Sequence, residues 1–283
     1  MDGMVAPKIG FIIQARMNSS RLKGKILLPL PYGSATSLLE QIIIRVKAIS
    51  NNAVIILATS DTLENKILKD VAEANSIFFY AGSENNVLQR FYEAAAQHKL
   101  DIIVRLTGDN PFIDPDVIHT VLLNHTEHNF DYTITNGLPL GTNIEVFSFQ
   151  SLKKTYQEAV LPEHQEHVTP YIRLNNSLFK VNTFAFQDAT YGQEHWRLTV
   201  DTESDYALAC LLFWQLTDNN KSFSLKQTAS FIYANPWVLL INKNNYQKKL
   251  FSNVAEEIKE AISLLHNNDL PNAAKQLAQN EQN

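Results

Sequence analysis

The amino-acid sequence predicts an α/β fold in which a mostly parallel sheet carries helices on both faces. Short apolar runs alternate with segments of helical spacing four times in the first half of the chain. Each apolar run stops at a polar turn, and the runs at residues 11–13 and 54–58 contain no polar residue, as is typical of strands buried on both faces. Repeated alternation of this kind indicates parallel strands joined by helical crossovers.

The first half of the chain supplies four of these units. Strands are expected at residues 11–13, 54–58, 77–80 and 101–106. Helices are expected at residues 37–49, 63–74 and 86–98, where apolar residues recur at helical spacing. A fourth helix should begin at Asp114-Pro115-Asp116, because this triplet offers a capping aspartate, a proline at the first helical position and an acid in the first turn.

The alternation becomes irregular after residue 131. Strands are expected at residues 131–135, 143–149 and 196–200 and an extended segment at 178–186, with a helix at 151–160. A helix capped by Asp201 or Thr202 should then run to Trp214. The second half therefore predicts a mixed arrangement of strands and helices.

This change of pattern divides the chain. Residues 1–234 should form the main domain, with residues 131–195 as a small inserted mixed subregion. Residues 235–283 should form a helical C-terminal extension with an apolar stripe from Leu250 to Leu265, which favours packing on its own domain or on a second subunit. The last residues are rich in Asn and Gln and are expected to be disordered.

Bulk composition excludes several classes of protein. The chain has 283 residues, of which 45% are hydrophobic and 19% charged, an ordinary globular composition. Its net charge of -5 and isoelectric point of about 5.9 provide no general basic field for nucleic acid. The single cysteine, Cys210, excludes a disulfide scaffold. Without an apolar run of roughly 18 residues or a signal peptide, the sequence favours a cytoplasmic protein that makes no contact with a membrane.

A basic loop follows the first expected strand. Its cations are Arg16, Arg21, Lys23 and Lys25. Four cations at the carboxyl end of a parallel strand repel one another unless an anion lies among them, and phosphate is the usual anion. The chain contains neither Gly-x-x-x-x-Gly-Lys-Ser/Thr nor Gly-x-Gly-x-x-Gly. The loop is therefore either solvated surface or a triphosphate site of another kind.

Polar turns at the expected strand ends suggest a ligand site. These turns cover residues 14–25, 59–61, 81–84 and 107–111, and the carboxyl ends of parallel strands share one rim. Asp109 should therefore lie near the basic loop, and Asp201 follows a later strand. Mg2+ is often held by one or two carboxylates plus substrate phosphates. Each aspartate alone could be a turn or cap residue, but the pair opposite a basic loop predicts a magnesium site.

Five motifs in order resemble one known family. They are Ile-Ile-Gln-Ala-Arg-x-x-Ser-x-Arg-Leu-x-Gly-Lys, Ala-Thr-Ser-Asp, Arg-Leu-Thr-Gly-Asp-Asn-Pro-x-Ile-Asp-Pro, Glu-His-Val-Thr-Pro-Tyr-Ile and Arg-Leu-Thr-Val-Asp-Thr-x-x-Asp. Over residues 8–250 the chain resembles the cytidylyltransferase family that contains the spore coat polysaccharide biosynthesis protein. It is similar, more distantly, to CMP-sialate and CMP-Kdo synthetases.

The resemblance implies a nucleotidyltransferase of the glycosyltransferase A-type, Rossmann-like fold. Such an enzyme would use CTP and Mg2+ to convert a sugar or sugar-like acceptor to its CMP conjugate, with release of pyrophosphate, for surface polysaccharide or glycan biosynthesis. Residues 1–234 would be the nucleotidyltransferase domain, and the insertion at 131–195 would serve the acceptor or oligomerisation. Family habit also implies a homodimer.

Motif positions imply the site residues. The catalytic set would be Arg16, Lys25, Asp109 and Asp201, of which the two aspartates would also bind the metal. The nucleotide would contact Gln14, Ala15, Arg16, Arg21, Lys25, Ala81, Gly82, Ser83 and Thr107. Glu145, His167 and Arg197 lie in motifs of the acceptor side. Each of these three has a structural alternative: Glu145 facing solvent, His167 as a buried hydrogen-bonded histidine, and Arg197 paired with an acid.

Two departures from the family pattern concern the acceptor and the loop. Asn143 stands where close relatives commonly have an aspartate, and Lys23 replaces a proline in the basic loop. Either change could alter which acceptor is used.

Three competing functions remain open: a glycosyltransferase of the same fold, a nucleotidyltransferase for another base, and a non-catalytic nucleotide-binding or scaffold protein. The Arg-Leu-x-Gly-Lys loop favours an intact triphosphate over a nucleotide sugar, whereas no side-chain pattern excludes another base. Magnesium-dependent release of pyrophosphate would separate an enzyme from a scaffold protein.

Overall fold

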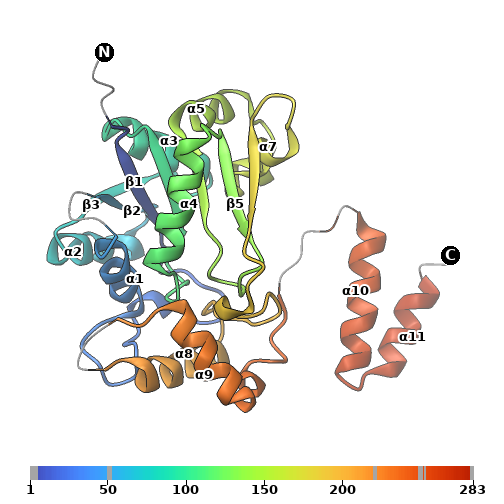
Figure 1. Ribbon diagram of the computed structural model, residues 1–283. Coiled ribbons are helices and arrows are strands. Elements are labelled where there is room, and N and C mark those ends of the chain that lie inside the picture. Colours follow the sequence, from blue (N-terminus) through green and yellow to red (C-terminus); the bar gives the residue numbers. More distant parts are fainter. Residues whose placement is uncertain (1–5, 50–52, 219–221, 248–250, 252, 281–283) are drawn as a thin grey trace. The chain divides into compact units, whose positions relative to one another are not determined.

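The computed structural model describes residues 6–49, 53–218, 222–247, 251 and 253–280. It divides into two compact units, Met1–Asn244 and Asn245–Asn283 (Figure 1). The expected disorder of the last residues concerns 281–283, which lie outside the described part of the chain.

A seven-stranded sheet forms the centre of the larger unit. Its strands are β1 (Ile9–Gln14), β2 (Val54–Ser60), β3 (Phe78–Gly82), β4 (Ile102–Thr107), β5 (Tyr132–Asn136), β6 (Glu145–Ser148) and β7 (Val181–Ala185). They lie in the order β3-β2-β1-β4-β6-β5-β7. All neighbouring pairs are parallel except those of β6, which runs antiparallel to β4 and β5. The mostly parallel sheet and its first four strands are therefore confirmed.

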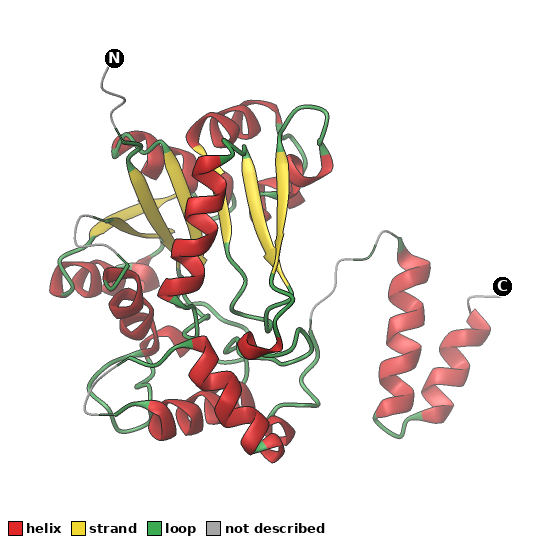
Figure 2. Cartoon of the chain, viewed as in Figure 1, coloured by secondary structure: helices red, strands yellow, loops and turns green. Residues whose placement is uncertain are grey.

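Helices cover both faces of this sheet (Figure 2). The helices of the larger unit are α1 (Leu38–Lys47), α2 (Ile67–Ala74), α3 (Val87–Gln97), α4 (Pro115–Glu127), α5 (Phe149–Glu158), α6 (Pro162–His167), α7 (Pro170–Leu174), α8 (Glu203–Leu216) and α9 (Leu225–Ala234). Short 3-10 turns occur at η1 (Lys25–Leu27), η2 (Leu63–Asn65), η3 (Ala189–Tyr191) and η4 (Pro236–Ile241). The sequence did not anticipate α6, α7 or α9.

The capping predictions are confirmed. The Asp114 carboxylate accepts hydrogen bonds from the backbone N–H groups of Asp116 and Val117 at the start of α4. Thr202 caps α8 and forms a capping box with Asp205. These side chains satisfy backbone donors that the first helical turn leaves unpaired.

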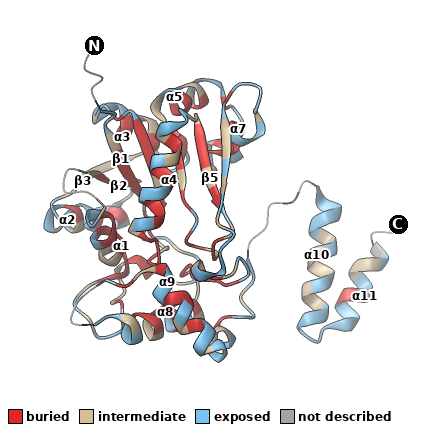
Figure 3. Ribbon diagram, viewed as in Figure 1, coloured by how far each residue is buried: buried red, intermediate tan, exposed pale blue. Residues whose placement is uncertain are grey.

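β1 separates two hydrophobic cores. Phe11 and Ile13 pack on the side of α1, α2, α4, α8 and α9, whereas Ile12 packs on the side of α3, α5 and α7. None of the three is more than 2% exposed, and burial on both faces explains the absence of polar residues from the run (Figure 3).

The expected strand at residues 196–200 is wrong. This extended segment makes one isolated bridge, between Arg197 and Leu140, and its Val200 N–H donates to the Asp109 carbonyl at 2.9 Å. Leu140 and Asp109 both belong to loops. The segment therefore has no continuous partner strand with which to form a ladder.

The larger unit extends beyond the domain limit expected at residue 234. η4 packs against α8 and α9, and its Val238 is fully buried. The compact unit ends at Asn244, so the helical extension is shorter than the sequence suggested.

The smaller unit is a hairpin of α10 (Val254–Asn267) and α11 (Pro271–Asn280). Ile258, Ile262 and Leu265 of the expected apolar stripe are half-buried in it, whereas Val254 is exposed and Leu250 lies outside the described residues. Within the described part of the chain, every helix is too short or too polar to cross a membrane.

Candidate active site

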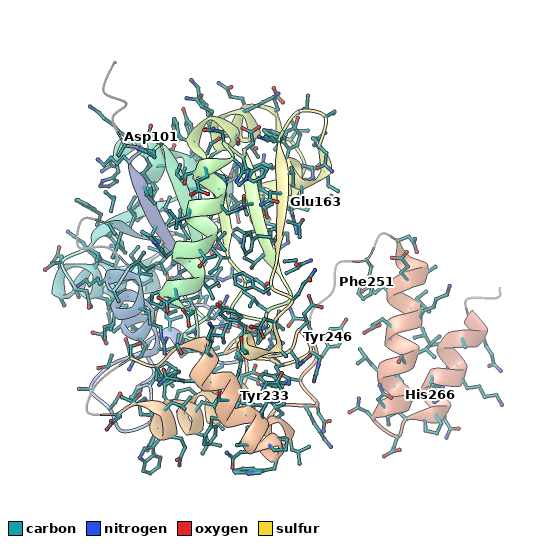
Figure 4. The ribbon with its side chains drawn as sticks, viewed as in Figure 1. Asp101, Glu163, Tyr233, Tyr246, Phe251 and His266 are labelled. Atoms are coloured by element: carbon teal, nitrogen blue, oxygen red, sulfur yellow. The ribbon has the colours of Figure 1, made fainter. Side chains whose placement is uncertain are left out.

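The carboxyl ends of β1, β2, β3 and β4 form one rim, as the strand-end turns predicted. Gln14 is in register with Ala58 on one side and with Thr107 on the other. Asp101 lies at the amino end of β4, away from this rim, and its carboxylate accepts a hydrogen bond from the Lys8 backbone N–H (Figure 4). The polar turns that follow these four strands are therefore neighbours in space.

The Gly108-Asp109 turn lies directly against the start of the basic loop. The Gly108 N–H donates to the Gln14 carbonyl at 2.8 Å. A Cβ atom at Gly108 would come within 2.8 Å of the Ala15 Cβ, closer than packed side chains allow. Glycine at this position therefore lets the loop and the turn meet.

Lys25 joins the two predicted metal aspartates. Its Nζ donates to Asp109 Oδ2 at 2.9 Å, to Asp201 Oδ1 at 2.8 Å and to the Val200 carbonyl at 2.8 Å. The Lys25 side chain is only 8% exposed. An ammonium group has three N–H donors, and the three oxygens around Lys25 Nζ provide one acceptor for each donor. The structure thus brings together the basic loop and both aspartates, as the sequence predicted.

Asp201 is the more heavily neutralised of the two carboxylates. Its Oδ2 lies 2.7 Å from an Arg197 nitrogen and 3.2 Å from an Arg21 nitrogen. Burial alone would raise the pKa of Asp201, but hydrogen bonding and attraction from Lys25, together with Arg21 and Arg197, hold it below its usual value. Asp201 is therefore a carboxylate anion at neutral pH.

Arg197 lies beside the predicted metal pair. Its Nε donates to Asp205 Oδ1 at 2.9 Å, and Asn242 Nδ2 donates to that same oxygen at 2.9 Å. These contacts correspond to the alternative in which Arg197 pairs with an acid, and they give no support to an acceptor-side role. The Arg197 guanidinium also donates to Asp201 Oδ2 and so orients that carboxylate.

Thr107 holds the other carboxylate. Its hydroxyl donates to Asp109 Oδ1 at 2.7 Å and accepts a hydrogen bond from Asn110 Nδ2 at 2.8 Å. Asp109 Oδ2 therefore faces Lys25 in a fixed orientation. Nearby, Gln14 Oε1 is buried and has no hydrogen-bond partner among the described residues, which leaves an acceptor for a ligand donor.

A residue that the sequence did not single out anchors the basic loop. Asn65, in η2, accepts the Met17 backbone N–H on Oδ1 at 2.8 Å, and its Nδ2 donates to the hydroxyls of Ser60 and Thr62. The Met17 carbonyl in turn accepts the backbone N–H groups of Ser19 and Gly24. Asn65 is 2% exposed. A buried asparagine in a 3-10 turn therefore holds the Met17 backbone, which in turn bonds two other residues of the basic loop.

Replacing Asn65 with Ala should loosen this loop without unfolding the protein. Loss of a buried hydrogen bond costs about 1–3 kcal/mol, so backbone amides in residues 15–25 should exchange roughly five- to 150-fold faster by hydrogen–deuterium exchange. Asn75→Ala is the control, because the Asn75 side-chain amide donates a hydrogen bond to the Val71 carbonyl of α2 and not to the basic loop. Unchanged exchange in the loop of the Asn65 variant would refute the anchoring role.

The turn after β3 is bonded to Arg90, whose guanidinium interacts electrostatically with Arg16. Ala81 and Gly82 end β3, and Arg90 donates from α3 to the carbonyls of Ser83 and Glu84. Burial lowers the pKa of Arg90, and the charge of nearby Arg16 lowers it further. The predicted nucleotide residues at 81–83 and in the basic loop therefore gather at one end of the rim.

Glu145 lies in a buried network on the face covered by α3, α5 and α7. Its carboxylate accepts from Arg105 at 2.5 Å, from the Tyr132 hydroxyl at 2.5 Å and from the Thr169 hydroxyl at 2.8 Å. Burial would raise the pKa of Glu145, but Arg105 and these hydrogen bonds hold it below its usual value. Sequence reasoning assigned no role to Arg105, although it is the one charged residue in the β4 run Ile-Ile-Val-Arg-Leu-Thr.

The Glu-His-Val-Thr motif contributes a strained turn. The Thr169 N–H donates to the His167 carbonyl at 2.8 Å, and Val168 between them has φ 70° and ψ -54°. A β-branched residue rarely adopts this conformation. The turn directs the Thr169 hydroxyl to Glu145, while the half-buried His167 takes part through its backbone.

The donor set suits a divalent cation shared with a substrate. Among the described residues, His, Cys, Asp and Glu form no group of three that could hold a metal by themselves. Asp109 and Asp201 nevertheless converge on a single cationic group, the Lys25 ammonium. Two carboxylates completed by phosphate oxygens are a usual arrangement for Mg2+.

Comparison with known proteins identifies a single family. The profile of the cytidylyltransferase family matches residues 10–258. The chain is 37% identical over 242 residues to an uncharacterized protein of Methanocaldococcus jannaschii, covering 85% of this chain and 97% of that one. It is 34% identical over 231 residues to the spore coat polysaccharide biosynthesis protein SpsF of Bacillus subtilis, covering 80% and 94%.

A solved structure shares the fold. A cytidylyltransferase from Leptospira borgpetersenii superposes with a TM-score of 0.76 at 28% identity. The match covers 86% of this chain and 100% of that one.

Proposed function

The chain belongs to the cytidylyltransferase family, and from this premise we propose that it transfers CMP from CTP to a sugar or sugar-like acceptor, with release of pyrophosphate. The observation that carries the proposal is the meeting of Lys25 with Asp109 and Asp201 at the rim of the sheet. We further propose that the enzyme requires Mg2+ and acts in the cytoplasm as a homodimer, in surface polysaccharide or glycan biosynthesis. The insertion within residues 131–195 would serve the acceptor or the dimer interface.

The basic loop would bind the triphosphate. Arg16 and Arg21 are exposed at the rim, where their guanidinium groups can each offer two parallel donors to phosphate oxygens. Lys25 would supply a third cation. Gln14 and the turn at residues 81–83 would contact the nucleoside, since the buried Gln14 Oε1 can accept a donor of the ligand.

Asp109 and Asp201 would hold the metal ion. When bound, Mg2+ would neutralise negative charge on the phosphates. The protein's own contribution would be orientation: Thr107 fixes Asp109, and Arg197 fixes Asp201. Both carboxylates are thereby positioned before the substrate arrives.

The acceptor would approach from the side of Glu145. An oxygen of the acceptor attacks the α-phosphorus, and the bond from that phosphorus to the bridging oxygen of pyrophosphate breaks in line. Glu145 and His167 would line the acceptor side, with Arg105 and Thr169 holding Glu145 in place. Catalysis would come mainly from positioning and from charge stabilisation.

CTP with Mg2+ should raise the melting temperature of the protein. A ligand at about 100 times its Kd stabilises the native state by about 2.7 kcal/mol, which corresponds to a Tm rise of roughly 5–10 °C for a domain of this size. UTP, ATP and GTP, each with and without Mg2+, are the comparison. If a nucleotide sugar raises the Tm and no triphosphate does, the result would favour a glycosyltransferase. If no nucleotide of either kind changes the Tm, the result would favour a scaffold protein.

A further inference from the structure

The contacts of Lys25 have a bearing on how metal enters the site. Its Nζ lies 2.8 to 2.9 Å from one oxygen of Asp201, one of Asp109 and the Val200 carbonyl. A divalent cation on the same carboxylate oxygens would sit at about 2.0–2.1 Å from each. Two cations cannot share this point, so metal and ammonium compete for the same two oxygens.

The described ion pairs around this point contain as many positive as negative side chains. Three cationic side chains meet three carboxylates in one connected set: Lys25, Arg21 and Arg197 with Asp109, Asp201 and Asp205. A metal ion entering alone would add positive charge to this neutral set and would displace a buried ammonium from three acceptors. Both effects oppose binding of the bare ion.

A triphosphate reverses both effects. Even with a divalent cation bound, it carries net negative charge, and its oxygens offer Lys25 new acceptors. The four-carbon stem of lysine allows the ammonium to move from one set of oxygens to the other. The carboxylates that Lys25 leaves are then available to the metal.

We propose that Lys25 makes the Asp109–Asp201 pair selective for a divalent cation that arrives with a nucleoside triphosphate over the bare ion. The inference rests on the proposed function, because it assumes that these two carboxylates hold the metal. Lys25 is thus a specificity-determining residue in addition to a phosphate ligand.

Mn2+ binding to the nucleotide-free protein tests the inference. Electron paramagnetic resonance measures free Mn2+ directly, and wild type should bind it weakly at this site. Lys25→Met should bind Mn2+ at least about tenfold more tightly, since it removes a competing charge a few ångströms from the metal. Lys23→Met is the matched control, because Lys23 lies exposed on the same loop, and it should bind as wild type does.

Two further variants make the outcome specific. Adding Asp109→Asn to Lys25→Met should abolish the gain in Mn2+ affinity, which locates the ion at the aspartates. Lys25→Gln replaces Lys25→Met if circular dichroism shows that the latter is unfolded. Equal Mn2+ affinity of wild type and the Lys25 variants would overturn the inference, as would tight Mn2+ binding by nucleotide-free wild type.

Failure of the proposed function has a different signature. If CTP with Mg2+ does not raise the Tm of wild type, the nucleotide site itself is wrong. If CTP does raise it while the Lys25 variants bind Mn2+ no better than wild type, only the role of Lys25 in metal selection is lost.

Discussion

Replacing Asp109 with Asn should lower kcat by on the order of 10³-fold or more, the loss expected when a preorganised charge is removed from a phosphoryl-transfer site. Asparagine keeps the shape of the side chain and can still accept from Lys25, but it loses the negative charge. The change removes one of the two carboxylates that converge on the Lys25 ammonium. Pyrophosphate release in the presence of CTP, Mg2+ and an identified acceptor is the measurement.

Asp116→Asn provides the matched control. Asp116 is exposed in the first turn of α4, only a few residues from Asp109 along the chain. Its replacement should leave kcat close to that of wild type. Full activity in Asp109→Asn would remove Asp109 from the metal site, and a large fall in Tm would show that its role is structural instead.

Replacing Glu145 with Leu should destabilise the protein by about 3–5 kcal/mol, the cost typical of breaking a buried ion pair by removing one partner. The Arg105 and Glu145 side chains are 19% and 12% exposed. Without the carboxylate, the Arg105 guanidinium and the hydroxyls of Tyr132 and Thr169 lose a common acceptor. Denaturant unfolding with an unchanged m-value would measure the loss.

A second variant separates the ion pair from its surroundings. Changing Arg105 to Met in the Glu145→Leu background should restore much of the stability, because two apolar groups leave no unpaired charge in the sheet. If the double variant is as unstable as the single one, the hydroxyl contacts rather than the charge pair account for the loss.

The pH dependence of stability should follow from the same network. The folded protein holds the pKa of Glu145 below its ordinary value of 4.5. The ionised carboxylate therefore contributes stability that is fully present above that value and is lost as the pH falls through the lower pKa of the folded state. This acid-induced loss should be smaller in the double variant than in wild type.

The sequence by itself determined the elements whose signals are local. The apolar run at residues 11–13 specified a strand buried on both faces, and Asp114-Pro115 specified the start of α4, because hydrophobic period and capping depend on residues close together in the chain. Parallel alternation then placed the strand ends on one rim. That placement brought Asp109 to the basic loop, as β1 and β4 confirm.

Tertiary structure decided the pairings between distant residues. Lys25 meets Asp109 and Asp201 across separations of 84 and 176 positions, and no local pattern shows that a predicted phosphate ligand lies between two predicted metal ligands. The same reason applies to Asn65, whose side chain contacts a loop 48 positions away.

The remaining differences have the same physical origin. Residues 196–200 have the apolar character of a strand, but a strand exists only where a partner lies alongside, and loops occupy those places here. In the sequence, Arg105 is a single charged residue within an apolar run. In the structure, antiparallel β6 places Glu145 directly opposite Arg105. Local periodicity fixes which segments become strands and helices, whereas the partner of each buried charge depends on how those segments are packed together.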